Sequence, residues 1–200
     1  FNADGSSRSS GLDITKNIDE IVEQSIHYDV FINNAFDGPP DTPWGNYGQV
    51  NLLMAIYKRW SELKKDGWIF NIGSTGEKTV VSPNPDSETY RVAKAALSYA
   101  SKQCTRAYKD NIVNFKTTLI TPDRLDTPLS RSRLQKYLEE TGELQDSNNP
   151  QDEFTVNSHW TGSALSCTDI AEFIDYCIKM KHASVIEEVT IYANLVGGTQ

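Results

Sequence analysis

The stretch SETYRVAKAALSYA, residues 87–100, places a tyrosine and a lysine four positions apart in a run of small apolar residues. Residues at this spacing lie on one face of an α-helix, so Tyr90 and Lys94 are expected to be neighbours. An ammonium near a phenol favours the phenolate and lowers a pKa that starts near about 10. A phenol of this kind can donate and accept a proton near neutral pH. The stretch therefore predicts a helix over residues 87–109 that carries an acid–base pair.

Apolar runs alternate with amphipathic segments on both sides of this helix. The apolar runs predict strands at residues 12–14, 29–36, 68–74, 112–120 and 184–193. The spacing of apolar residues predicts further helices over residues 16–27, 47–65 and 168–180, the last one capped by Thr168. This alternation predicts an α/β fold, a doubly wound parallel sheet with helices on both faces. We expect residues 1–200 to form a single domain.

The ends of the predicted strands are the places to look for a site, because ligands of such sheets bind beyond the carboxyl ends of the strands. The residues there are small or polar: Asn33-Asn34-Ala35, Gly73-Ser74 and Thr121-Pro122. Residues 128–162 are polar and acidic, and the part EETGELQDSNNPQDE reads as an exposed loop. We expect residues 128–162 to be an insertion beside the substrate.

The composition limits the partners of the chain. Its formal net charge is −8, and its 19 Lys and Arg residues are scattered, so neither nucleic acid nor an anionic membrane surface is an expected partner. No apolar run is long enough for a membrane-spanning helix. The 3 cysteines lack metal-type spacing, which predicts reduced, buried thiols in a cytoplasmic protein. The histidines are far apart in sequence, so no metal site is expected.

Four motifs occur in the order NNA (33–35), IGS (72–74), YRVAK (90–94) and TPDRLDT (121–127). Together they resemble the motifs of the short-chain dehydrogenase/reductase family, and the resemblance extends over residues 4–193. It implies an oxidoreductase that interconverts a small-molecule carbonyl and an alcohol with NAD or NADP. On this resemblance Tyr90 is the general acid or base, Lys94 lowers its pKa and binds the nicotinamide ribose, and Ser74 polarises the substrate carbonyl. For Ser74, a serine that only caps a turn is the alternative.

The resemblance extends to three residues near the second predicted strand. Asn51, in GQVNLLMA, matches the helix asparagine that holds a proton-relay water. A surface or helix-packing asparagine is the alternative, because the gap from Asn33 to Asn51 is shorter than usual in the family. Asn33 and Ala35 match the loop under the adenosine half of the cofactor, where the asparagine also ties strands together.

Four further residues match cofactor contacts of the family. Asp13 and Ile14 resemble the aspartate and apolar residue that contact adenine, although Asp13 could instead cap the helix that follows. Pro122 and Thr127 match the loop that faces the nicotinamide. The resemblance therefore implies a nucleotide along the strand ends.

The segment SSRSSG, residues 6–11, bears on the choice of cofactor. In this fold the end of the second strand faces the adenosine ribose, where an acidic residue binds the 2′-hydroxyl and an arginine accommodates a 2′-phosphate. Arg8, between Ser7 and Ser9, offers a planar cation and hydroxyl donors that suit phosphate. NADP is therefore predicted over NAD, with a solvated arginine as the alternative.

The sequence contains no glycine-rich turn for a pyrophosphate. The family's first strand, turn and first helix are therefore expected to precede residue 1; alternatively, another subunit fills their place. The resemblance also implies a homodimer or tetramer that pairs through the tyrosine helix, where Ala93, Ala96 and Ala100 permit close contact. The alternative function is an NADP-binding regulator or inactive relative without turnover.

Overall fold

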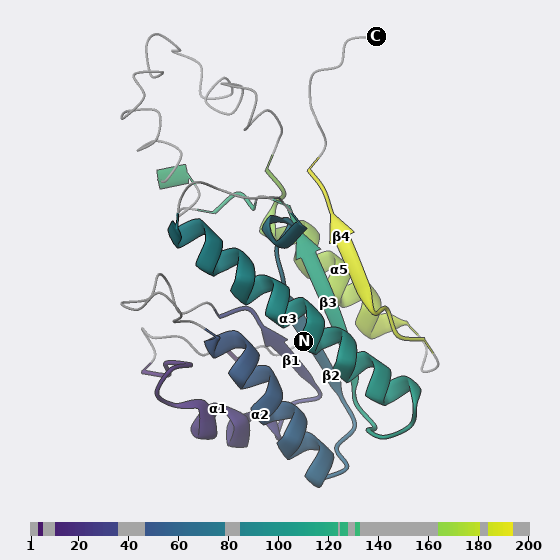
Figure 1. Cartoon of the computed structure of the whole chain (residues 1–200). Coiled ribbons are helices and arrows are strands. Elements are labelled where there is room, and N and C mark those ends of the chain that lie inside the picture. Colours follow the sequence, from purple (N-terminus) through teal and green to yellow (C-terminus); the bar gives the residue numbers. More distant parts are fainter. Residues whose placement is uncertain are drawn as a thin grey trace, which may run out of the picture. The chain divides into compact units, whose positions relative to one another are not determined.

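The structure is a computed structural model that describes residues 4–5, 11–35, 47–78, 85–123, 125–127, 131–132, 164–180 and 184–193. Within these residues, helices and strands alternate along the chain (Figure 1). The helices are α1 (Ile18–Ser25), α2 (Gly48–Glu62), α3 (Pro85–Lys109), α5 (Cys167–Lys179) and the short 3₁₀ helix η2 (Thr75–Lys78). The strands are β1 (Val30–Asn33), β2 (Trp68–Ile72), β3 (Lys116–Pro122) and β4 (Glu188–Ile191).

The strands form one 4-stranded sheet in the order β1-β2-β3-β4. β1, β2 and β3 are parallel, with Trp68 opposite Val30 on one side and Lys116 on the other. β4 runs the same way, because hydrogen bonds join Leu119 to Glu187 at 3.0 Å and Asp123 to Ile191 at 2.8 Å, so both segments advance together. The predicted parallel α/β sheet is confirmed.

The chain divides into two compact units, residues 1–121 with 181–189 and residues 122–180 with 190–200. In the first unit α1, α2 and α3 lie side by side on one face of the sheet (Figure 1). The core between them includes Leu53, Trp60, Leu97 and Phe115, all fully buried. The indole Nε1 of Trp60 donates to Ser25 Oγ at 3.0 Å and so joins α2 to α1. The single domain expected for residues 1–200 stays a prediction.

The predicted strands differ from the structure in several places. Those expected at 184–193 and 29–36 are shorter, as β4 (Glu188–Ile191) and β1 (Val30–Asn33). Residues 12–14 form no strand: the Asp13 carbonyl accepts hydrogen bonds from the backbone of Lys16 and Asn17 at 2.9 and 2.8 Å, so the chain turns there. The strand expected at 112–120 begins only at Lys116. Asn111 has a left-handed backbone with φ 56° and Ile112 is 69 % exposed, so the chain turns there, and Val113 and Phe115 are buried before the strand begins.

The cap of α5 is also different from the prediction. Ser166, not Thr168, is the N-cap: its hydroxyl accepts from the Thr168 N–H at 3.1 Å. The Asp169 carboxylate accepts in return from the Ser166 N–H at 2.9 Å, which completes a capping box. The prediction chose the wrong one of two neighbouring hydroxyl residues.

The expectation of buried cysteines holds for two of the three. Cys104 and Cys177 are buried, whereas Cys167 is exposed. Cys167 is the first residue of α5, one turn before the buried residue Ile170 and two turns before the buried residue Ile174, and it is left exposed at the start of the helix. In the described part of the chain, no helix has the length and apolar character needed to cross a membrane.

Candidate active site

Tyr90 and Lys94 lie one turn apart on α3, and the Lys94 ammonium is 5.7 Å from the centre of the Tyr90 ring. Lys94 is only 5 % exposed. Its Nζ donates to the Ile72 carbonyl, at the end of β2, at 2.8 Å. It also donates to Gln49 Oε1, on α2, at 2.9 Å. The cation is therefore held at a strand end beside the phenol, as the spacing predicts.

Burial governs the charge of Lys94. Removal from water lowers the pKa of Lys94 from 10.5 to about 8, and the negative charge of Glu77 opposes this change. The pKa of Glu77 is itself raised, mainly by burial, against a hydrogen bond from Ser98. Lys94 is thus charged at neutral pH and titrates just above it.

Ser74 follows β2 and begins the turn that leads into η2. Its hydroxyl oxygen accepts a hydrogen bond from the Gly76 N–H at 3.1 Å, so Ser74 caps this turn, as its alternative role requires. A hydroxyl that accepts still has its own hydrogen to donate. A Cβ added at Gly76 would lie 3.2 Å from Ser74 Oγ and 3.7 Å from Tyr90 Cε1, so the hydroxyl and the phenol ring border the same small space. The structure therefore brings Ser74 and Tyr90 together.

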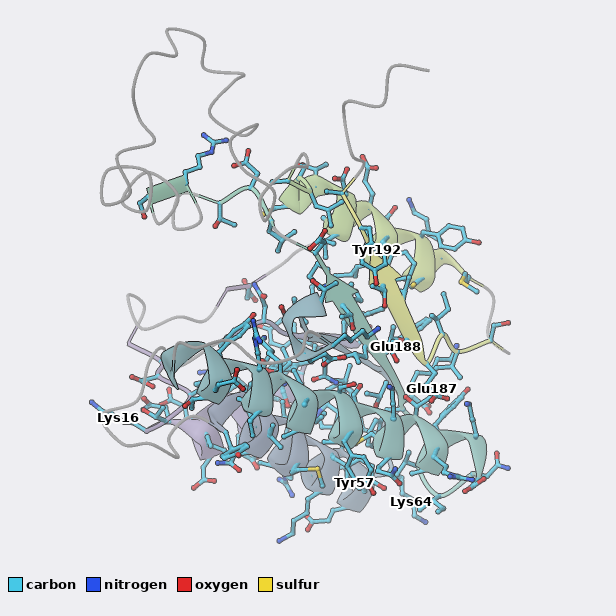
Figure 2. All side chains as sticks on the ribbon, turned by 45° about the horizontal axis from the view of Figure 1, so that its top comes forward. Lys16, Tyr57, Lys64, Glu187, Glu188 and Tyr192 are labelled. Carbon is cyan, nitrogen blue, oxygen red and sulfur yellow. The ribbon has the colours of Figure 1, made fainter. Side chains whose placement is uncertain are left out.

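An ion-pair cluster joins the turn that carries Ser74 to α3. Glu188, at the beginning of β4, is labelled in Figure 2. Its carboxylate oxygens lie 2.9 Å from Lys78 Nζ of η2 and 2.7 Å from Lys102 Nζ of α3. Hydrogen bonds from Lys102 and Lys78 lower the pKa of Glu188. The cluster thus helps to keep η2 beside the helix that carries Tyr90.

A buried polar network lies behind the tyrosine and lysine. Asn33, at the end of β1 and 1 % exposed, donates through Nδ2 to the Gln49 carbonyl at 3.0 Å and to Asn71 Oδ1 at 2.9 Å. Asn71 Nδ2 donates in turn to Ser101 Oγ at 3.2 Å. Ser101 is on α3, as Lys94 is, so the network connects β1 and β2 to the helix that carries Tyr90. Asn33 thus makes the strand-tying contacts that the resemblance implies.

Gln49 is the site residue that the sequence reasoning missed. It is 4 % exposed, and its Nε2 donates to the carbonyls of Asn33 at 2.6 Å and Ile72 at 3.2 Å. Asn51, two positions further on α2, is exposed instead. Helical periodicity could have found Gln49, because it is in register with the buried residues Leu52, Leu53, Ile56 and Trp60. The relay role of Asn51 stays a prediction.

Four residues predicted near the adenosine, Asp13, Ile14, Asn33 and Ala35, lie in the first unit. The Asp13 carboxylate accepts from the Thr15 N–H at 2.8 Å and the Thr15 hydroxyl at 2.7 Å, so it caps a turn. Ile14 is 7 % exposed and belongs to the core, against which Ala35 packs. Contacts of Asp13, Ile14, Asn33 and Ala35 with a nucleotide stay predictions.

The remaining cofactor residues are elsewhere in the chain. Pro122 ends β3 and belongs, with Thr127, to the second unit. Ser7, Arg8 and Ser9 lie outside the described residues, as does 128–162 apart from Arg131 and Ser132. Their predicted roles are untested by the structure.

No protein-family model matches the chain, and a comparison with curated proteins finds no match either. Solved structures do match. A variant of actinorhodin polyketide ketoreductase with NADPH has a TM-score of 0.65 at 18 % identity, over 92 % of this chain and 78 % of that one. The chain shares the fold of this ketoreductase. L-sorbose reductase from Gluconobacter frateurii, complexed with NADPH and L-sorbose, has a TM-score of 0.63 at 17 % identity, over 94 % of this chain and 76 % of that one. 4-hydroxyisoleucine dehydrogenase complexed with NADH has a TM-score of 0.56 at 20 % identity, over 94 % of this chain and 80 % of that one.

Proposed function

We propose that the chain is a short-chain dehydrogenase/reductase that interconverts a small-molecule carbonyl and an alcohol by hydride transfer with NADP. The observation that carries this proposal is the grouping of Ser74, Tyr90 and Lys94 at the end of β2. The fold supports it, because the ketoreductase and the sorbose reductase that share the fold are structures with NADPH.

The described residues fit a nicotinamide nucleotide. Lys94 offers an ammonium at the carboxyl ends of β1 and β2, where sheets of this kind bind dinucleotides. Gly76 leaves open the space between Ser74 and Tyr90 that a Cβ would enter. Lys94 would hold the nicotinamide ribose, and Arg8 the 2′-phosphate. The bound nucleotide would supply or accept the hydride.

The chain's own residues would move the proton. Tyr90 would donate it to the carbonyl oxygen during reduction and accept it during oxidation, while the Ser74 hydroxyl holds that oxygen. The Lys94 charge favours the phenolate by Coulomb attraction, so this assistance is present while Lys94 is protonated, below about pH 8. We therefore expect the rate of reduction to lose this support at alkaline pH.

The proposal is tested by titrating NADPH into the full-length protein, with nucleotide fluorescence as the readout, and by following NADPH absorbance with a panel of carbonyl compounds. Binding with turnover supports the oxidoreductase. Binding without turnover across a broad panel favours the regulator, and failure to bind either NADPH or NADH contradicts the proposal. Pairing of copies through α3 stays a prediction, and the elution volume of the protein would test it.

A further inference from the structure

The side chain of Gln49 contacts two strand ends and one helix. Its Nε2 donates to the carbonyls that end β1 and β2, those of Asn33 at 2.6 Å and Ile72 at 3.2 Å. Its Oε1 accepts from Lys94 Nζ at 2.9 Å. The side chain is almost completely buried, so water cannot replace a lost partner without a rearrangement.

These contacts admit only one orientation of the amide. Two carbonyl oxygens require a donor, and an ammonium requires an acceptor. If the amide were turned by half a rotation, its oxygen would face two carbonyl oxygens and its NH₂ group would face the ammonium. The network itself therefore assigns the oxygen to the side of Lys94.

The backbone of Gln49 is held as well. Asn33 Nδ2 donates to the Gln49 carbonyl at 3.0 Å, and Asn33 is fixed in turn by Asn71 at 2.9 Å. The first turn of α2 is thereby attached to β1 and β2. Movement of the Gln49 oxygen away from Lys94 would break several buried hydrogen bonds together.

We propose that Gln49 is the positioning residue of Lys94, whose ammonium its fixed amide oxygen holds directly beside Tyr90. This inference rests on the proposed function, in which Lys94 assists Tyr90. Family resemblance predicts a water held by a helix asparagine in this place, but the side chain of Asn51 is exposed. A direct amide contact from Gln49 would replace the water.

The surroundings of Lys94 make its titration a suitable readout. The titratable groups that face it include Tyr90, from α3, and Glu77, from η2. The contacts from α2 and β2 are the neutral oxygen atoms of Gln49 and Ile72. Removing the Gln49 side-chain oxygen therefore takes a hydrogen bond from Lys94 without removing a charged group.

The test is an NMR titration of the Lys94 side chain in protein with ¹³C-labelled lysine, with the resonance assigned by its loss in Lys94→Met. Gln49→Met removes the acceptor at similar length, and we expect the pKa of Lys94 to fall by about one pH unit, since a hydrogen bond to a charged group favours the charged form. Gln49→Glu restores an oxygen and adds a negative charge, so the pKa should rise above its wild-type value. Gln103→Met, at an exposed position of α3, is the matched control and should change nothing.

Activity gives a second readout. We expect Gln49→Met to lower kcat more than it raises KM for NADPH, and to move the alkaline limb of the pH profile downward together with the Lys94 titration. An unchanged Lys94 pKa in both Gln49→Met and Gln49→Glu would overturn the inference. If Gln49→Met does not fold, the titration of Gln49→Glu decides alone. A wild-type protein without turnover would contradict the proposed function, whereas the Lys94 titration would still test the inference.

Discussion

Replacing Lys94 by methionine should change how stability depends on pH. Moving the pKa of a lysine from 10.5 to about 8 corresponds to about 3 kcal/mol of free energy that opposes folding while the group is charged. Between these two pKa values the unfolded chain binds more protons at Lys94 than the folded chain does. The free energy of unfolding of the wild type therefore rises with pH in this range, and the rise is absent from Lys94→Met.

The assay is urea unfolding of both proteins at a series of pH values. The free energy of unfolding of the wild type, minus that of Lys94→Met, should increase by about 2.5 kcal/mol between about pH 6 and about pH 10. Most of this increase should occur above about pH 8. The absolute difference at neutral pH also contains the lost hydrogen bonds to Gln49 and Ile72, so the slope is the informative quantity. Lys58→Met, at an exposed position of α2, controls for the loss of one positive charge. If the difference in the free energy of unfolding between wild type and Lys94→Met does not change between about pH 6 and about pH 10, Lys94 does not have the lowered pKa that burial is expected to cause.

Three other predictions concern packing, the polar network and the cofactor. Gly67→Ala should lower the free energy of unfolding by about 1–3 kcal/mol, because its Cβ would lie 2.7 Å from the Trp60 ring and 2.9 Å from the Asp29 carbonyl. Urea unfolding measures this, with Gly5→Ala as the control because nothing lies within 4 Å of the added Cβ; equal effects would contradict the clash. Asn71→Ala should cost about 1–3 kcal/mol in the same assay by leaving its buried partners without hydrogen bonds, and a cost below about 0.5 kcal/mol would speak against the network. Arg8→Asp should weaken binding of NADPH more than that of NADH, and equal weakening would remove Arg8 from the phosphate site.

The centre of the sheet was predictable because β2 and all of β3 except Lys116 are buried. All of β2 is buried, so it appears in the sequence as a continuous apolar run, WIFNI. The same rule failed at residues 12–14, where Ile14 is buried although the chain turns. Three residues are too few to separate a buried turn from a strand, since both place apolar side chains in the core.

The tyrosine–lysine pair was predictable because both residues belong to one helix, whose geometry sets their separation. The partner of Lys94 comes from another helix, and the two amides Gln49 and Asn51 differ only in the face of α2 on which they lie. Family resemblance pointed to Asn51, whereas the periodicity of buried residues on α2 points to Gln49. Which amide reaches the strand ends depends on which face of α2 packs on the sheet, and the motif around Asn51 does not indicate that face, whereas the helical periodicity does.

The most direct test of the chemistry is the rate of NADPH oxidation, with a carbonyl compound that the wild type reduces, for wild type and Tyr90→Phe at equal nucleotide occupancy. We expect the phenylalanine variant to bind NADPH but to react at least about 100-fold more slowly, because the ring keeps its place and loses only the hydroxyl that donates the proton. Equal rates in the two proteins would contradict the role of Tyr90 as the general acid.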